Sequence, residues 1–417
     1  MKLFTEAHSC LLEILDKKTP FRLAIDNACS KNTTFREDRK NLYSIIGCSL
    51  RHFYIFDYLI NKVNEEFIIE QKVALYLFLS NYLFVPIVGS EETESFLNEL
   101  NISNSDVEKL KELCADKTKL IPTEYKNNSI EYLHYRFNIP SWVLKMWMKH
   151  YKGNIYRIAK TINKPVNHYA ILNEYKLSKD DLIQKYPEIK TTQFDGLYLY
   201  DGNVPPRKHS LFRSGTLVGI SPAEYHLLNS LDLDPLRKIA VYSEIYLDLQ
   251  NQLIAILGNK YQMDYIAGSS ESYYPTKKDL ERTNLNKVNL YECNHSSIIT
   301  CLSEKVHTFF VSPKNSNFAE FRKSPDYFNR LEQSELDGII ENQLNALLSA
   351  ADFVEDDGLL IYVIPTMDKK ETERTISNFL KSRPDYSLVE QHQFLPFDKY
   401  DSILFISILK KVEATND

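Results

Sequence analysis

The C-terminal part of the chain alternates short apolar segments of strand type with longer segments of helical periodicity. Strands spaced by helices form a mostly parallel sheet, because each return to a parallel neighbour needs a helix-length connection. The clearest helix covers 336–354, and we interpret Gly358 as its stop signal. The short, non-helical segment 391–401 predicts that the last two strands form an antiparallel hairpin, with a final antiparallel strand at the sheet edge. The seven predicted strands are Ile239–Ser243, Met263–Ala267, Val288–Glu292, Thr308–Val311, Leu359–Ile364, Ser387–Glu390 and Ile403–Ile408.

The N-terminal part, residues 1–130, has the three- and four-residue spacing of apolar side chains that is typical of helices packed on one face. Residues 73–85 are more continuously apolar, so we expect a central helix there that Pro86 ends. A further helix is predicted over 105–115, with a capping box that starts at Ser105. Nothing in this part has the pattern of a catalytic site.

The middle of the chain combines two kinds of local pattern. A pair of short helices is predicted between 140 and 162, broken near Gly153, and a helix capped by Ser178 runs to Lys185 among short strands and Pro/Gly turns. The predicted fold class is therefore multidomain α plus α/β, with a Rossmann-like, seven-stranded, mostly parallel sheet at the end. The expected domains are 1–130 (helical), 131–230 (basic helical and α/β linker) and 231–417 (Rossmann-like).

Composition excludes several classes of protein. With 43% hydrophobic and 25% charged residues, the chain is an ordinary globular protein. No apolar run approaches the roughly 18 residues of a membrane span, and the start has no signal-peptide core, so we expect a cytoplasmic protein without membrane contact. The six cysteines include no CxxC pair, which argues against a disulfide framework or a zinc knuckle. His295, Cys301 and His307 have the spacing of no recognised metal site, and no metal is predicted.

The net charge is −6, but the charged residues are distributed unevenly along the chain. Residues 132–173 contain no Asp or Glu, whereas 331–373 contain eleven acids and two bases. The basic stretch predicts an RNA surface, because its cations can neutralise phosphates and its aromatic rings can stack on bases. The alternative interpretation is that the tryptophans belong to a helix core and that the lysines lie on an ordinary solvated face. The candidate RNA-binding residues there are Arg136, Trp142, Lys145, Lys149, Lys152, Arg157, Lys160 and Lys164. A second, weaker group is Arg207, Lys208 and Arg213.

Motifs along nearly the whole chain are similar to those of a known family. They are Glu37-Asp38-Arg39, Ile46–Arg51, Ile139–Trp147 (similar to HPxWLxxxW), Phe212–Gly215 (FxxG), Arg322–Asp326 (RxxPD), Gln343 and Asp357–Tyr362 (GGxLVY). With this order the chain resembles the RsmB/Sun (Fmu) family of ribosomal RNA cytosine-C5 methyltransferases. The resemblance implies a NusB-like N-terminal domain, a class I methyltransferase fold, S-adenosylmethionine as cofactor and ribosomal RNA as substrate.

The chemical motifs of that family are missing from this chain. Its glycine-rich cofactor loop would fall near 241–248, where glycine is absent, and the acid that would hold the cofactor ribose is missing from 266–269. The family's two reactive cysteines fall on Lys314 and Pro365. A thiolate must add to cytosine C6 before C5 can accept a methyl group, and neither residue supplies one. Weaker candidates are Asp248, Asp264 and Glu292 as remnants of cofactor ligands, and Lys314 and Thr366 as the lining of a remaining pocket.

These observations predict a catalytically inactive relative of the family that binds no cofactor. Its expected partner is structured RNA, ribosomal in kind, and its expected role is that of an assembly or stabilising factor. One alternative is an active S-adenosylmethionine-dependent RNA methyltransferase with atypical motifs. Another is a protein-interaction module in transcription or ribosome assembly, which would dock through the N-terminal helical domain or the acidic segment 331–373.

Overall fold

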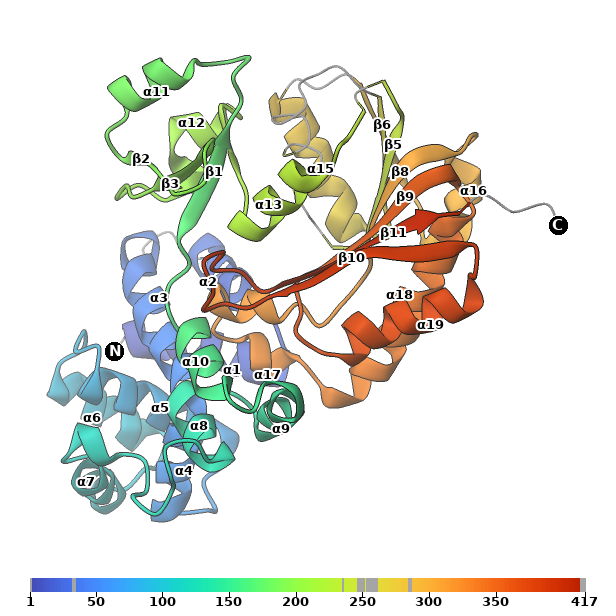
Figure 1. Cartoon of the computed structure of the whole chain (residues 1–417). Helices are drawn as coiled ribbons and strands as arrows, with labels where there is room; N and C mark the ends of the chain where they lie inside the picture. Colours follow the sequence, from blue (N-terminus) through green and yellow to red (C-terminus); the bar gives the residue numbers. More distant parts are fainter. Residues whose placement is uncertain are drawn as a thin grey trace. The chain divides into compact units, whose positions relative to one another are not determined.

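A computed structural model describes residues 2–31, 35–234, 236–245, 252, 262–283 and 287–412. The chain divides into two compact units (Figure 1). The helical unit comprises Met1–Lys164 and Glu320–Gln333, and the sheet unit comprises Pro165–Ala319 and Ser334–Asp417. This division differs from the three segments expected from the sequence, because 131–164 pack with the N-terminal helices and 165–230 pack with the Rossmann-like sheet. Among the described residues, no helix combines the length and apolar content that a membrane crossing requires.

The helical unit is organised around α5, which has a mostly buried surface and contacts α1, α3, α4 and α6. As predicted, this central helix ends before Pro86. The predicted cap of α7 is wrong, because the hydroxyl of Ser103, not of Ser105, accepts the first-turn amide of Asp106. The helices are α1 (Lys2–Asp16), α2 (Phe21–Lys31), α3 (Phe35–Arg51), α4 (Phe53–Val63), α5 (Ile69–Leu83), α6 (Ser90–Glu99), α7 (Asn104–Leu113), α8 (Ile130–Phe137), α9 (Ser141–Tyr151), α10 (Ile155–Ile162) and α17 (Tyr327–Arg330).

A buried asparagine, Asn138, contributes to holding helix α8 against the N-terminal helices. Asn138 ends α8 in the left-handed conformation, with φ of 54°, which asparagine tolerates better than most residues. Its side-chain amide donates to the carbonyl of Leu50 at 2.7 Å, and its side-chain oxygen accepts the amide of Tyr54 at 3.1 Å. These bonds satisfy backbone groups at the junction of α3 and α4, so α8 is fixed against the N-terminal helices. The predicted break between α9 and α10 near Gly153 is confirmed.

The larger sheet of the sheet unit has the strand order β10-β11-β9-β8-β5-β6-β7. Strands β5 to β9 pair in parallel, so the predicted Rossmann-like methyltransferase-type fold is confirmed. The predicted hairpin is present, but β11 lies between β9 and β10, and the edge strand is therefore β10 rather than the last strand of the chain. The bounds are β5 (Ile239–Ser243), β6 (Met263–Ala267), β7 (Val288–Glu292), β8 (Val306–Ser312), β9 (Val354–Ile364), β10 (Tyr386–Phe394) and β11 (Leu404–Lys411).

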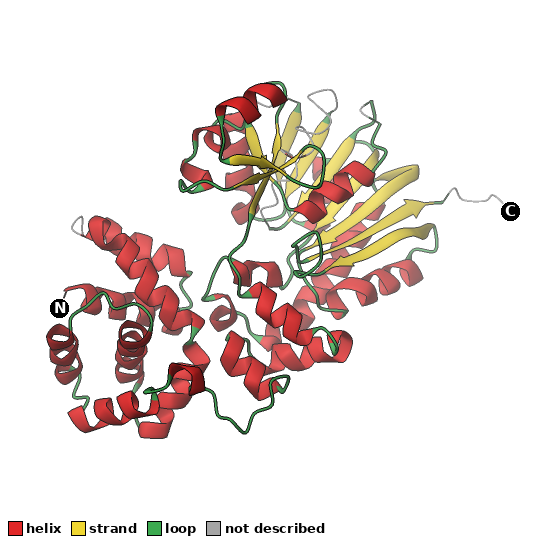
Figure 2. Cartoon of the chain, turned by 60° about the vertical axis from the view of Figure 1, so that its left-hand side comes forward, coloured by secondary structure: helices red, strands yellow, loops and turns green. Residues whose placement is uncertain are grey.

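Helices cover both faces of this sheet (Figure 2). One face packs against α18 (Leu336–Ala351) and α19 (Thr375–Ser382), and the other against α13 (Pro222–Ser230) and α15 (Ser270–Thr283). The predicted helix end is wrong, because α18 stops at Ala351 and Val354 already begins β9. Gly358 lies inside that strand, where a Cβ atom would sit 2.7 Å from the carbonyl oxygen of His307. The glycine therefore allows two strands to approach closely and does not stop a helix.

A smaller antiparallel sheet precedes the large one, with strand order β2-β3-β1-β4. The predicted helix cap in this region is confirmed, because the hydroxyl of Ser178 accepts the amide of Asp181 at the start of α11 (Lys179–Lys185). The remaining elements are β1 (His168–Leu172), β2 (Ile189–Thr191), β3 (Leu197–Tyr200), η2 (Pro206–Lys208), α12 (Ser210–Arg213) and β4 (Leu217–Gly219).

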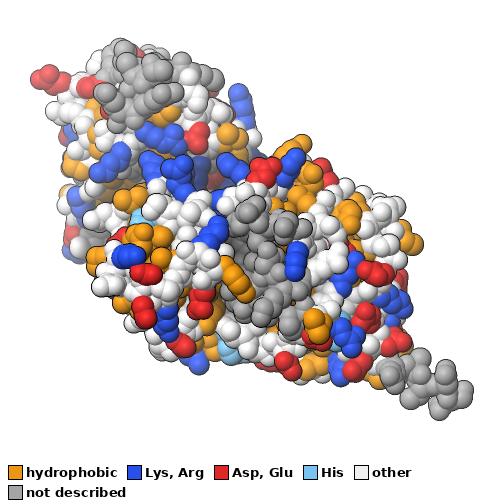
Figure 3. Space-filling view, turned by 90° about the horizontal axis from the view of Figure 1, so that it is seen from above, with side chains coloured by type: hydrophobic (Ala, Val, Ile, Leu, Met, Phe, Trp, Pro, Cys, Tyr) orange, Lys and Arg blue, Asp and Glu red, His pale blue; other side chains and the backbone are white. Residues whose placement is uncertain are grey.

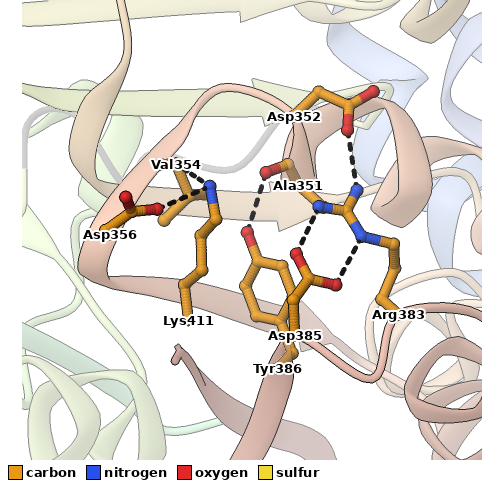
Figure 4. Close-up of polar contacts among 8 residues, drawn as sticks. All are labelled: Ala351, Asp352, Val354, Asp356, Arg383, Asp385, Tyr386 and Lys411. Atoms are coloured by element: carbon orange, nitrogen blue, oxygen red, sulfur yellow. Dashed lines mark hydrogen bonds and ion pairs between the residues drawn. The ribbon is translucent and has the colours of Figure 1, made fainter. Parts of the chain in front are cut away.

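The edge strand β10 is held at its amino end by a group of charged side chains (Figure 4). The guanidinium of Arg383 makes a bidentate pair with Asp385, at 2.9 and 2.7 Å, and reaches Asp352 at the end of α18 at 2.7 Å. Beside them, the Tyr386 hydroxyl donates to the carbonyl of Ala351 at 2.8 Å. The group joins α18, the end of α19 and β10 at the edge of the sheet where the parallel strands begin. Bonds from Arg383 hold the pKa of Asp385 below its ordinary value.

Replacing Asp385 with Asn should lower stability at neutral pH and leave it nearly unchanged in acid. A depressed carboxyl pKa stabilises the fold above the unfolded pKa of about 3.9, and this contribution is lost as pH falls through the folded value. Because solvent screens the pair, we expect a loss of about 1 kcal/mol or less at pH 7. Urea denaturation at several pH values measures it. Asp337→Asn, which removes a more exposed pair with Lys370, is the control with little effect, and an equal loss for Asp385→Asn at every pH would contradict the assignment.

Candidate functional site

The first candidate site is the edge of the large sheet where the parallel strands end. In open α/β sheets, ligands bind outside the carboxyl ends of the strands, where the connections to neighbouring strands diverge. The register places the ends of β5, β6 and β8 side by side, at Ser243, Ala267 and Ser312, and β9 ends beside β8. The segments that follow these ends contain the positions at which the family resemblance locates cofactor and cysteine motifs.

Directly after β5, the side chain of Glu244 is tied down by three donors. The hydroxyl of Tyr242 donates to its Oε1 at 2.8 Å, and the amide of Lys314 and Nδ2 of Asn342 donate to its Oε2 at 2.6 and 2.7 Å. Burial and the neighbouring carboxylate raise the pKa of Tyr242, so its hydroxyl stays protonated and remains a donor. Glu244 therefore joins β5 to the loop after β8 and to α18, and its carboxylate serves the protein's own groups.

Gly268 directly follows β6 and belongs to the segment 266–269, near which the resemblance requires an acid for the cofactor ribose. A Cβ atom there would lie 2.5 Å from Cγ of Glu244 and 2.6 Å from the hydroxyl oxygen of Tyr242. The side chains of Tyr242 and Glu244 therefore fill the space that a side chain at position 268 would enter. The remainder of the predicted cofactor segment, including Asp248, lies outside the described residues.

The positions of the family's two cysteines lie at the ends of β8 and β9. Lys314 is exposed and Pro365 is half-buried. All six cysteines of the chain lie within the described residues, and none of them belongs to these two loops. Thr366, predicted as a possible pocket lining, is instead fully buried, with its hydroxyl oxygen 2.6 Å from that of Ser316.

The buried carboxyl group of Glu371 connects these two loops by hydrogen bonds. Its Oε2 accepts the amide of Ser316 at 2.8 Å and Nε2 of Gln343 at 2.9 Å, and its Oε1 accepts the hydroxyl of Thr366 at 3.1 Å. Burial raises the pKa of Glu371 above its ordinary value, although each of these donors favours the ionised form. The hydroxyl of Tyr362 donates to its backbone carbonyl at 3.0 Å. The network fixes the loops after β8 and β9, and neither loop contains a cysteine.

Of the other predicted remnants of cofactor ligands, Glu292 lies at this edge and Asp264 does not. Asp264 is buried near the start of β6, at the opposite end of the strand, where it pairs with Lys238 at 2.8 Å. Glu292 ends β7 with an exposed side chain. Of the three residues considered as metal ligands, His307 lies near the start of β8, whereas His295 follows the end of β7. In the described parts of the chain, no group of three or more His, Cys, Asp or Glu side chains has an arrangement that would hold a metal ion.

The second candidate site consists of exposed cations on α8, α9, α10 and their connections. We call its seven cations the basic helical surface: Arg136, Lys145, Lys149, Lys152, Arg157, Lys160 and Lys164. All seven side chains are exposed. Figure 3 shows one face of the chain, on which basic and acidic side chains are interspersed. Residues 132–173 differ from this mixed distribution, because these 42 residues contain no acid. Such a surface attracts polyanions.

The aromatic residues of this stretch divide between core and surface. Trp147 is 1% exposed and its ring lies 6.4 Å from that of Phe328, so it is a core residue, as the alternative interpretation of the tryptophans held. Tyr151 is also buried. Trp142 and Tyr156 are half-buried and keep part of their rings accessible. Of the two tryptophans, only Trp142 is therefore placed to stack on a base.

The second predicted basic group lies in the sheet unit. Arg207 and Lys208 are exposed on η2, and Arg213 is exposed at the end of α12. The neighbouring His209 is half-buried and lies 2.9 Å from Glu188, so this ring orients the turn.

The acidic segment 331–373 does not form one continuous surface. Glu371 and Asp368 are buried, Asp352 pairs with Arg383, and Glu332 belongs to the helical unit, where it contacts Lys18. Many of its acids thus serve the fold.

Comparison with known proteins gives similarity in fold. No protein-family model matches the chain, and no curated protein matches it. The solved structure of PH0851 has a TM-score of 0.76 at 16% identity over 97% of this chain and 98% of that one. The solved structure of a methyltransferase homolog protein from Pyrococcus horikoshii has a TM-score of 0.57 at 14% identity, and it covers 67% of this chain and 98% of that one. The structure of NSun6 from Pyrococcus horikoshii with SFG has a TM-score of 0.58 at 13% identity, and it covers 67% of this chain and 100% of that one. The chain therefore has the fold of methyltransferases, as its strand order indicates.

Glu371 gives a prediction on stability and its pH dependence. Glu371→Leu should cost several kcal/mol, because it leaves the Ser316 amide and Gln343 without their acceptor at about 1–3 kcal/mol each. Glu371→Gln should cost less, since the amide oxygen still accepts. A raised carboxyl pKa gives a contribution that is present below the unfolded pKa of about 4.3 and is lost as pH rises through the folded value.

Urea denaturation between acid and neutral pH tests these expectations. The wild-type chain should lose stability relative to Glu371→Gln as pH rises. If Gln and Leu cost the same, or if the wild type and Glu371→Gln follow parallel pH profiles, the buried carboxyl does not have the role assigned to it.

Proposed function

We propose that this chain is an RNA-binding protein that uses a methyltransferase-type fold without transferring methyl groups. In this proposal the chain is a degenerate relative of the Sun family, with a NusB-like N-terminal domain. The basic helical surface is its main RNA contact, and Arg207, Lys208 and Arg213 add a second one. The observation that carries the proposal is the exposure of all seven cations in a stretch without a single acid.

The chemistry of RNA supports this assignment of the surface. Phosphates are neutralised by exposed Lys and Arg side chains, and the half-buried Trp142 leaves part of a ring for an unpaired base. Solved structures of the same fold include one named NSun6 and one named a methyltransferase homolog. These names agree with the methyltransferase-type fold. The resemblance of the motifs and the basic helical surface support structured RNA, ribosomal in kind, as the ligand class, and an assembly or stabilising role.

The absence of methyl transfer is supported by the chemistry of the loops after β8 and β9. Cytosine C5 becomes nucleophilic only after a soft nucleophile adds to C6, and Lys314 and Pro365 stand where the family has thiols. Side chains of Tyr242 and Glu244 fill the space beside Gly268, at the position of the family's ribose-binding acid. Both differences point to a protein that keeps the framework for binding.

Charge reversal on the basic helical surface should abolish most RNA binding. We expect Lys145, Lys149, Lys152 and Arg157 all changed to Glu to weaken binding to ribosomal RNA fragments by at least about 100-fold at low salt. The salt dependence should fall as well, by about 0.7 to 0.9 in the slope of log K against log salt for each phosphate that is no longer neutralised. Filter-binding titrations over a range of salt concentrations measure both effects.

A matched control reverses four exposed lysines elsewhere in the helical unit. These are Lys17, Lys109, Lys119 and Lys126, which lie outside residues 132–173. This control has the same change in net charge and should retain most of the affinity. Equal weakening in the two variants, or no salt-dependent binding by the wild type, would refute the surface assignment, and circular dichroism checks that each variant is folded.

The enzyme alternative makes the opposite prediction on cofactor binding. We expect isothermal calorimetry to detect no micromolar binding of S-adenosylmethionine, and labelled methyl groups not to enter RNA. Micromolar binding with methyl incorporation would establish the atypical enzyme instead. Co-purification of a protein partner that survives nuclease treatment would favour the interaction module, docked through the N-terminal helices or the acidic segment 331–373.

A further inference from the structure

Two of the six cysteines lie in direct contact in the sheet unit. Cys293 follows β7, and Cys301, the last residue of α16 (Ile298–Cys301), is 8 positions further along the chain. Their Sγ atoms are 2.6 Å apart. The other four cysteines, Cys10, Cys29, Cys48 and Cys114, are buried in the helical unit.

The separation of the two sulfurs lies between a bond and an ordinary contact. A disulfide bond is about 2.05 Å long, whereas non-bonded heavy atoms usually stay roughly 3.5–4.0 Å apart. The two side chains are half-buried and pack against the core between the sheet and α18. The connection between them is short, so the entropic cost of closing it is small. Side chains in this arrangement need little movement to bond.

We propose that Cys293 and Cys301 are a modification site, at which a peroxide-class oxidant forms an intramolecular disulfide. In the first step one thiolate attacks hydrogen peroxide, the O–O bond breaks, and a sulfenic acid forms with loss of hydroxide, which takes up a proton as water. In the second step the other sulfur attacks this sulfenic sulfur, the S–O bond breaks, and a second water leaves. Two thiols lose two electrons and two protons, and one peroxide is reduced to two waters.

The environment of the pair affects its reactivity. Burial and the adjacent Cys301 thiol raise the pKa of Cys293 to about 12, so Cys293 keeps its proton at neutral pH. Whichever sulfur attacks peroxide first, the other is 2.6 Å away and acts as the resolving sulfur.

The position of the pair connects oxidation to the carboxyl edge of the sheet. The amide of Cys293 donates to the carbonyl of Ala267 at 3.0 Å, immediately before Gly268. Nearby, Nε2 of His295 lies 3.0 Å from Oδ1 of Asn342, which also holds Glu244. The disulfide would thus close the loop that follows β7 beside the end of β6. This inference is independent of the proposed RNA binding.

Thiol mapping of the folded full-length chain tests the proposal. The wild-type chain is treated with hydrogen peroxide, denatured, alkylated and digested, and the peptides are identified by mass spectrometry. We expect two of the six thiols to disappear, a mass decrease of about 2 Da, and a reducible link between the peptides that carry Cys293 and Cys301. A link between other cysteines, or full alkylation of both residues after peroxide treatment, would overturn the proposal.

Two variants sharpen the result. Cys301→Ser should abolish the link, and Cys293→Ser should leave Cys301 to accumulate as sulfenic acid, which a dimedone probe detects. Cys114→Ser, in which a buried thiol of the helical unit is removed, should form the link as the wild type does.

Discussion

The buried carboxyl of Glu371 is the group on which the arrangement at the carboxyl edge depends. It accepts donors from the loop after β8, from α18 and from the loop after β9 at once. A buried carboxyl is costly to ionise unless its donors are held in place, so each of these elements constrains the others. Glu244 makes the equivalent connection from the end of β5 to the loop after β8 and to α18, so both carboxylates accept hydrogen bonds from the protein's own groups.

The fold and the catalytic chemistry of this edge have different sequence requirements. The strand order depends on apolar strands and helices of adequate length, which many sequences provide. Methylation of cytosine C5 depends in addition on a thiol that adds to C6. At the positions where the resemblance locates the two thiols, this chain has Lys314 and Pro365. A TM-score of 0.76 at 16% identity to PH0851 fits this separation, because backbone topology tolerates far more substitution than a reacting pocket does.

The sequence predicts the parallel strands well and the side-chain networks poorly. The predicted bounds of β5, β6 and β7 agree with the structure, because these strands are short apolar runs between polar turns. The end of α18 is not visible in the sequence, because Val354 continues the apolar stripe of the helix by one further step although it belongs to β9. Local periodicity contains no information about which element an apolar side chain will pack against.

The candidate site shows the same limit more sharply. The sequence can indicate that the cations of the basic helical surface are exposed, because charged side chains seldom lie in a core without a partner. Glu244 and Glu371 do not stand out in the sequence, since their partners lie up to 98 residues away in the chain. An acid directly after an apolar strand, as Glu244 is, was the available signal. Cys293 and Cys301 look scattered, because a spacing of 8 residues matches no known motif and only the turn after β7 brings the sulfurs together. In this chain, therefore, the fold brings Glu244, Glu371 and the cysteine pair to their partners, and the sequence alone does not indicate these contacts.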